Sequence, residues 1–121
     1  MGGDRSLLGR WGESEAARWM TKRGYRLIDR NWKCRFGEID LISLSGKYIC
    51  FTEVKLRKNR DFAQAREFVD GRKQEKVRTA AALYLARYPT DLQPRFDVAE
   101  VYAPEGPDTK HPEIHYIENA F

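Results

Sequence analysis

Three consecutive strand-like segments stand between two segments of helical periodicity, and this order limits the folds that are open to the chain. The expected strands cover residues 25–32, 38–44 and 48–56, which are rich in branched and aromatic side chains. The turn Ser45-Gly46-Lys47 predicts that the second and third strands pair as an antiparallel hairpin.

Two amphipathic segments flank these strands. Apolar residues recur at helical spacing in residues 8–23 and 70–88, so both segments are expected to be helices. A further strand is expected at 96–102 and a short edge strand at 114–117. The order α-β-β-β-α-β predicts an α/β fold in which helices flank a mixed sheet.

The length of 121 residues fits one domain, because two domains of half that size would bury too little surface. We therefore expect a single domain over 1–121, with 104–121 as a peripheral acidic C-terminal extension. No apolar run is long enough to cross a bilayer, so no membrane is expected among the partners. Cys34 and Cys50 are too few for a disulfide framework or a zinc site, which favours reduced thiols in the cytoplasm.

Positive charge is concentrated in two parts of the chain. Residues 1–35 carry 9 basic and 4 acidic side chains, and residues 54–90 carry 10 and 4. Between them, residues 36–53 carry 1 basic and 3 acidic side chains. This distribution suits a polyanion held beside a cation site, although basic residues that only solvate helix faces would give the same counts.

Charged residues inside two of the apolar strands are the candidates for chemistry. Asp40 lies among branched apolar residues, and the strand period of two places Glu53 and Lys55 on the same face as Phe51. Burying a carboxylate costs several kcal/mol unless a cation or hydrogen bonds compensate. A divalent metal keeps two adjacent carboxylates ionised, and hard oxygen ligands favour Mg²⁺ or Mn²⁺.

A plainer interpretation assigns each charge a structural role. Glu53 and Lys55 would then form an ion pair at the end of a strand, and Asp40 would cap a turn. The presence of all three on two strands of one hairpin favours the metal site, because Asp40 and Glu53 can then lie side by side.

The pattern of Asp40 followed by Glu53-Val54-Lys55 resembles the Asp…(Asp/Glu)-x-Lys signature of the restriction-endonuclease-like nuclease superfamily. The resemblance implies that the two acidic residues bind the metal and that the lysine orients or activates the attacking water. A longer series of motifs in the same order resembles the YraN-like family of small bacterial proteins, whose fold is similar to that of Holliday-junction resolvases. That series comprises Gly12-Glu13-Ser14-Glu15-Ala16, Gly24-Tyr25, Asn31, Gly37-Glu38-Ile39-Asp40-Leu41-Ile42, Phe51-Thr52-Glu53-Val54-Lys55, Arg57, Lys73 and Arg95-Phe96-Asp97-Val98.

Two further glutamates are candidates. Glu13 lies on the apolar stripe of the first helix, in register with Ala16 and Met20, and the resemblance implies that a first-helix glutamate completes the metal site. The alternative is a glutamate favoured by the dipole near the helix start. Glu38 shares a face with Asp40 and is expected to support the ligands. Thr52 departs from the resemblance, because the family usually has valine there.

Four basic residues are expected to bind nucleic acid: Lys73, Arg57, Lys58 and Arg72. Lys73 lies on the inward stripe near the start of the second helix, where a phosphate is favoured, although a lysine that extends to solvent would occupy the same position. The others belong to a basic loop with Arg60 and Arg66, and a merely solvated loop would look the same. Asp97 is expected to form a salt bridge with Arg95 or Arg57.

These features together predict a metal-dependent endonuclease that hydrolyses phosphodiester bonds in DNA and is structure-selective or weakly sequence-specific. Branched or single-stranded DNA is included among the partners, RNA is left open, and the resolvase-like resemblance implies a homodimer as one assembly. The alternative is a non-catalytic nucleic-acid-binding module that keeps the nuclease fold. A third hypothesis is a charged cluster that only stabilises a protein–protein interface.

Overall fold

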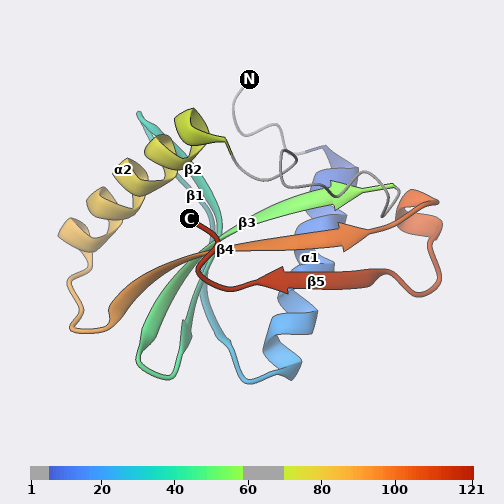
Figure 1. Cartoon of the computed structure of the whole chain (residues 1–121), viewed down its shortest axis with the longest axis horizontal. Coiled ribbons are helices and arrows are strands. Elements are labelled where there is room, and N and C mark those ends of the chain that lie inside the picture. The colour runs from blue at the N-terminus through green and yellow to red at the C-terminus, as the bar shows by residue number, and fades with distance from the viewer. Residues whose placement is uncertain (1–5, 59–69) are drawn as a thin grey trace.

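The computed structural model describes residues 6–58 and 70–121 and contains the expected elements, including the short edge strand near the C-terminus (Figure 1). None of the described helices is both long and apolar enough to span a membrane. The elements in chain order are α1 (Leu7–Lys22), β1 (Arg26–Cys34), β2 (Gly37–Ser45), β3 (Tyr48–Arg57), α2 (Gly71–Arg87), β4 (Gln93–Tyr102), the 3-10 helix η3 (Gly106–Asp108) and β5 (Glu113–Ile117).

The five strands form one mixed sheet in the order β1-β2-β3-β4-β5. The first three strands are antiparallel, and the predicted hairpin of β2 and β3 is confirmed. The connection through α2 makes β3 and β4 parallel, and β5 closes the edge as an antiparallel neighbour of β4. This architecture confirms the expected α/β class and is consistent with the restriction-endonuclease-like fold.

The two helices cover opposite faces of the sheet, and Figure 1 shows α1 crossing behind β3, β4 and β5. Adjacent residues of one strand supply the two cores: Cys50 packs with α1, whereas Phe51 packs beneath α2. The helical residues at the sheet are Ala16, Ala17 and Met20 from α1, and Val77, Ala80, Ala81 and Tyr84 from α2. Small alanines let both helices approach the strands closely.

In strand β2 the alternation of side chains between the two faces of the sheet is interrupted at Asp40. Ile39 and Ile42 pack beneath α2, whereas Leu41 packs in the core beneath α1. Strict alternation would put Ile39 and Leu41 on one face, so the strand is irregular between them. The neighbouring strand is distorted at the same level, where Asn31 adopts a φ of 54°. Asp40 therefore lies where the sheet departs from regular geometry.

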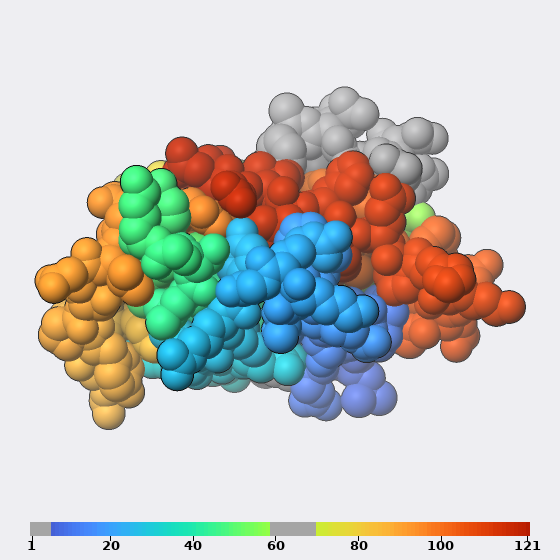
Figure 2. Space-filling model, turned by 90° about the horizontal axis from the view of Figure 1, so that it is seen from below, coloured from blue at the N-terminus to red at the C-terminus, as the bar shows by residue number. Residues whose placement is uncertain are grey.

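The C-terminal segment is anchored through Asp97, which is completely buried. The expected salt bridge with Arg95 is confirmed at 2.9 Å, and Tyr116 of β5 donates its hydroxyl to Asp97 at 2.6 Å. The Asn119 backbone N–H donates to the same carboxylate at 2.9 Å. Figure 2 shows this red C-terminal segment beside the blue residues of α1. Residues 113–119 are thus tied to the sheet by side chains as well as by strand pairing.

Thr52 takes part in the same network. Its hydroxyl lies 2.9 Å from the Tyr116 hydroxyl, within hydrogen-bond distance. Burial and the adjacent Asp97 carboxylate raise the pKa of Tyr116 above its ordinary value, which keeps the phenol protonated as a donor. The threonine that departs from the family resemblance therefore has a local role in the structure.

We expect Asp97→Ala to lower the free energy of unfolding by about 3–5 kcal/mol, because it leaves the buried guanidinium of Arg95 without its main counterion. Tyr116→Phe removes only one hydrogen bond to a charged group and should cost about 1.5–3 kcal/mol. Urea unfolding of both variants measures the two losses. A loss for Asp97→Ala no larger than that for Tyr116→Phe would contradict this assignment.

Candidate active site

The predicted catalytic residues line one cleft, of about 220 Å³, at the end of β3 between the two helices. Side chains from α1, β2, β3 and α2 meet there, although they are far apart in the sequence. The lining residues are Gly9, Glu13, Asp40, Glu53, Val54, Lys55, Leu56 and Lys73. The structure thus brings together Glu13, Asp40, Glu53 and Lys55, and adds Lys73 to them.

Asp40 lies where the hydrogen-bonded pairing of β2 and β3 stops. The last pair in the ladder is Leu41 with Thr52, and the same register continued by one residue would set Asp40 opposite Glu53. The Val54 backbone N–H instead donates to the Asp40 carboxylate at 2.9 Å. A side-chain oxygen therefore satisfies a strand donor beyond the ladder and fixes the aspartate at the cleft.

Glu53 has a strongly perturbed carboxyl group. Its side chain is only 4% exposed, and its Oε1 atom lies 3.4 Å from the Lys73 ammonium nitrogen. Its Oε2 atom is buried and has no hydrogen-bond partner among the described residues. Burial first, and then repulsion from Asp40, raises its pKa to about 8, while Lys73 and Lys55 act in the opposite direction.

Glu13 approaches the cleft from α1. Its side chain is 4% exposed, and Arg30 of β1 lies 4.0 Å from its Oε1 atom. The preceding residue, Gly12, allows this approach: a Cβ there would lie 3.0 Å from the Leu56 side chain of β3. The glycine lets α1 pack close to the end of β3 and bring Glu13 to the carboxylates.

Two lysines contribute positive charge. Lys55 is half-buried on β3, two residues beyond Glu53 and on the same face. Lys73 belongs to the first turn of α2, and its backbone N–H donates to the side chain of the N-cap Asp70 at 2.9 Å. The cap fixes the start of the helix and hence the place from which Lys73 reaches Glu53.

Other predicted binding residues lie elsewhere. Arg57 pairs with the buried carboxylate of Glu100 on β4 at 3.3 Å and does not line the cleft. Lys58 and Arg72 are exposed, and Glu38 lines a neighbouring groove. Arg60 and Arg66 lie outside the described residues.

Sequence reasoning did not identify Arg30, Phe36 and Lys76 as site residues. Arg30 faces Glu13, while Phe36 and Lys76 line the neighbouring groove together with Lys73. Phe36 had a detectable signal, because a large exposed aromatic residue is unusual in a tight turn between strands. The positions of Arg30 and Lys76 depend on tertiary packing, and no local pattern marks them.

Among residues 6–58 and 70–121, no group of three or more His, Cys, Asp and Glu side chains is arranged to hold a metal ion. Asp40 and Glu53 are therefore the adjacent carboxylate pair of the cleft, and Glu13 lines it without completing a three-carboxylate cluster. The buried Oε2 atom of Glu53, which has no partner within the described ranges, and the hard oxygen donors of Asp40 and Glu53 fit a divalent cation such as Mg²⁺ or Mn²⁺.

The five-stranded mixed sheet flanked by two helices makes this an α/β protein, and its architecture is consistent with a nuclease-like fold. The family model described as "Uncharacterised protein family UPF0102" matches residues 12–101. The chain belongs to this family, the YraN family, which confirms the resemblance drawn from the motifs.

Similar proteins cover nearly the whole chain. A UPF0102 protein of Caldanaerobacter subterraneus is 40% identical over 98% of this chain and 97% of its own length. One of Acetivibrio thermocellus is 42% identical over 98% of this chain and 93% of its own. One of Symbiobacterium thermophilum is 44% identical over 94% and 95%. These relatives support a bacterial origin for the chain.

The raised pKa of Glu53 predicts a pH-dependent stability of the metal-free protein. The protonated carboxyl is favoured in the folded state, so its stabilising contribution is complete below the ordinary pKa of 4.5 and is lost as the pH rises through about 8. Between pH 5 and pH 8 the loss should be on the order of 2–4 kcal/mol. Urea unfolding at several pH values in a chelating buffer measures it.

Glu53→Gln is the matched control, because the amide keeps the shape of the side chain and does not titrate. The variant should lack this part of the pH dependence and should approach or exceed the wild-type stability at pH 8. Identical pH profiles for the two proteins would show that Glu53 does not carry the shifted pKa.

Proposed function

We propose that the chain is a metal-dependent nuclease that hydrolyses phosphodiester bonds in DNA. The observation that carries the proposal is the cleft itself, which holds Asp40 and Glu53 at the end of a strand ladder beside Lys55. Two adjacent carboxylates and a lysine in a cleft are poorly explained by stability alone, because burying and pairing like charges costs free energy.

The cleft has the properties of a cation site. Glu53 carries one oxygen with no hydrogen-bond partner among the described residues and places the other 3.4 Å from the ammonium of Lys73. The Glu53 carboxylate thus already lies beside one positive group of the chain, the ammonium of Lys73. Asp40 and Glu53 would hold Mg²⁺ or Mn²⁺, with Glu13 acting through water, and the bound ion would supply a water of lowered pKa and a polarised phosphate.

Asp40, Lys55 and Lys73 have different roles in the proposed reaction. The Val54 backbone N–H donates to Asp40, which holds the carboxylate in place where it lines the cleft. Lys55 orients the attacking water or stabilises negative charge that develops on the phosphoryl oxygens. Lys73 binds a non-bridging phosphate oxygen from the first turn of α2, where the helix end also favours an anion.

The expected substrate preference follows from the kinds of contact that the chain offers. Lysine and arginine contacts to phosphates fix a strand without reading its sequence, which supports a structure-selective or weakly specific enzyme. Cys34 and Cys50 are free thiols, in keeping with the cytoplasm as the proposed location. A homodimer would place two such clefts on two strands of one branched substrate.

We expect Asp40→Asn and Lys55→Ala each to reduce Mg²⁺-dependent cleavage of branched or single-stranded DNA by at least about 10²-fold. Asp40→Asn keeps an oxygen that can accept from Val54, so the fold should be retained. Gel assays with defined junction, flap and single-stranded substrates measure the rates, and circular dichroism checks folding.

Glu15→Gln is a matched control from α1, because Glu15 pairs with Arg18 and does not line the cleft. It should cleave as the wild type does. A wild-type protein that binds these DNAs but neither cleaves them nor binds Mn²⁺ in calorimetry would establish the non-catalytic binding module instead. A protein with no affinity for DNA would leave only a structural role for the charges.

A further inference from the structure

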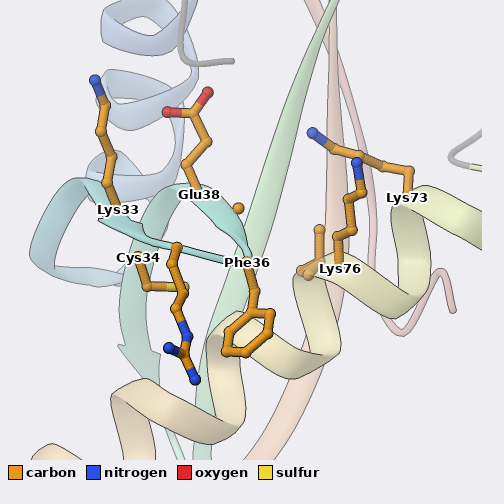
Figure 3. Close-up of a pocket in the computed structure, with 9 residues that line it drawn as sticks. Lys33, Cys34, Phe36, Glu38, Lys73 and Lys76 are labelled. Atoms are coloured by element: carbon orange, nitrogen blue, oxygen red, sulfur yellow. The ribbon is translucent and has the colours of Figure 1, made fainter. Parts of the chain in front are cut away.

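A second hollow, of about 410 Å³, adjoins the cleft between the turn that joins β1 to β2 and the first turns of α2. Figure 3 shows Lys73 and Lys76 extending from α2, with Lys33 and Glu38 on the strand side and Phe36 at the turn. Lys73 also lines the catalytic cleft, so the two hollows are neighbours. We call this hollow, lined by residues 33–38, 73, 76 and 77, the hairpin groove.

The hairpin groove is strongly basic. Four of its lining side chains are positive, and Glu38 is its one carboxylate: the positive residues are Lys33, Arg35, Lys73 and Lys76. A smaller neighbouring hollow shares Arg35, Phe36 and Lys76 with the groove and adds one basic and one acidic side chain, Arg72 and Glu75. Cations gathered around a groove repel one another, and a polyanion relieves that repulsion.

Phe36 gives the groove an aromatic face. Arg35 and Phe36 form the two-residue turn between Cys34 and Gly37, which pair across the hairpin. Neither residue has a positive φ, so this turn does not require Asn or Gly, and nothing in its geometry calls for a phenylalanine either. The ring remains 42% exposed, and the Arg35 guanidinium carbon lies 4.9 Å from its centre.

The turn is held against α2. Gly37 has a φ of 151°, and a Cβ built on it would lie 3.6 Å from the Cβ of Lys76. The turn of the hairpin therefore lies next to α2 at Lys76. Phe36 therefore belongs to a turn that lies beside α2 and lines one groove with Lys73 and Lys76.

We propose that the hairpin groove binds a single strand of nucleic acid, with an unpaired base stacked on Phe36 and its phosphates on Lys76 and Lys73. Basic side chains interleaved with an exposed aromatic ring are the means by which proteins bind single strands, because every base has a stacking face. An intact duplex keeps those faces inside its stack. The inference rests on the proposed function for nucleic acid as the partner, and it defines the substrate class as DNA with an unpaired nucleotide next to the cleaved phosphate.

The experiment compares two fluorescent probes in EDTA, so that no cleavage takes place. One is a short oligothymidylate, and the other is a duplex closed by a covalent linker at both ends, which offers no unpaired base. Phe36→Ala should weaken binding of the oligothymidylate by about 5- to 100-fold and change binding of the closed duplex by less than about 2-fold. Fluorescence anisotropy measures both dissociation constants.

Two further variants test the parts of the proposal separately. Tyr88→Ala removes another exposed aromatic residue, 47% exposed and about 17 Å along α2 from the nearest helical residue of the groove, Val77, and should change neither constant. Lys76→Ala should weaken binding of the oligothymidylate and lower the slope of log K against log salt concentration by about 0.7. Phe36→Leu keeps an apolar side chain without a ring and should behave like Phe36→Ala.

The outcomes separate this inference from the nuclease proposal. Unchanged oligothymidylate binding by Phe36→Ala would overturn the inference, even if the wild type cleaves DNA. Equal losses on both probes would overturn it too, because they would indicate general backbone binding or an altered fold. A selective loss in a protein that never cleaves DNA would support the groove and reject the nuclease.

Discussion

The burial of Glu53 beside Asp40 is the constraint from which the rest of the site follows. An unpaired buried carboxylate is so unfavourable that nearby elements must supply compensation. Here Lys73 reaches it from α2, and Lys55 supports it from its own strand. The other oxygen of Glu53 has no hydrogen-bond partner in the part of the chain that the structure describes, and there its burial is not compensated. Such uncompensated groups are typical of sites built for a ligand.

The sheet supplies this geometry by departing from regularity at one level. Pairing of β2 with β3 stops after Leu41, β2 changes its facing at Asp40, and β1 is distorted at Asn31. Beyond this point a side chain, and not the neighbouring strand, accepts a backbone hydrogen bond: the Val54 N–H donates to the Asp40 carboxylate. Gly12 lets α1 pack closely against Leu56 of β3 near this level, from the opposite face of the sheet to α2. A structural irregularity and a chemical site therefore coincide.

Local sequence patterns were sufficient to predict the elements, the β2–β3 hairpin and the juxtaposition of Asp40 with Glu53, because each depends on short-range periodicity and turn chemistry. The stripe position of Glu13 likewise predicted its burial. The partner of Arg57 was not predictable, since Glu100 reaches it only through the parallel pairing of β3 with β4. Pairing of that kind is set by the packing of the whole domain. The hairpin groove was missed for the same reason, because Lys76 meets the turn only in three dimensions.

Lys73 lines both the cleft and the hairpin groove. One side chain therefore affects the electrostatics at Glu53 and the positive charge of the groove together. Any replacement there changes the charge balance around Glu53 and, if the proposed groove binds a strand, would change that binding as well. A loss of activity in such a variant would be ambiguous between impaired chemistry and impaired capture. Genetic screens scored only by survival would merge the two effects. The same coupling would limit the substitutions tolerated at Lys73, because a compensating change in one hollow would not repair the other hollow.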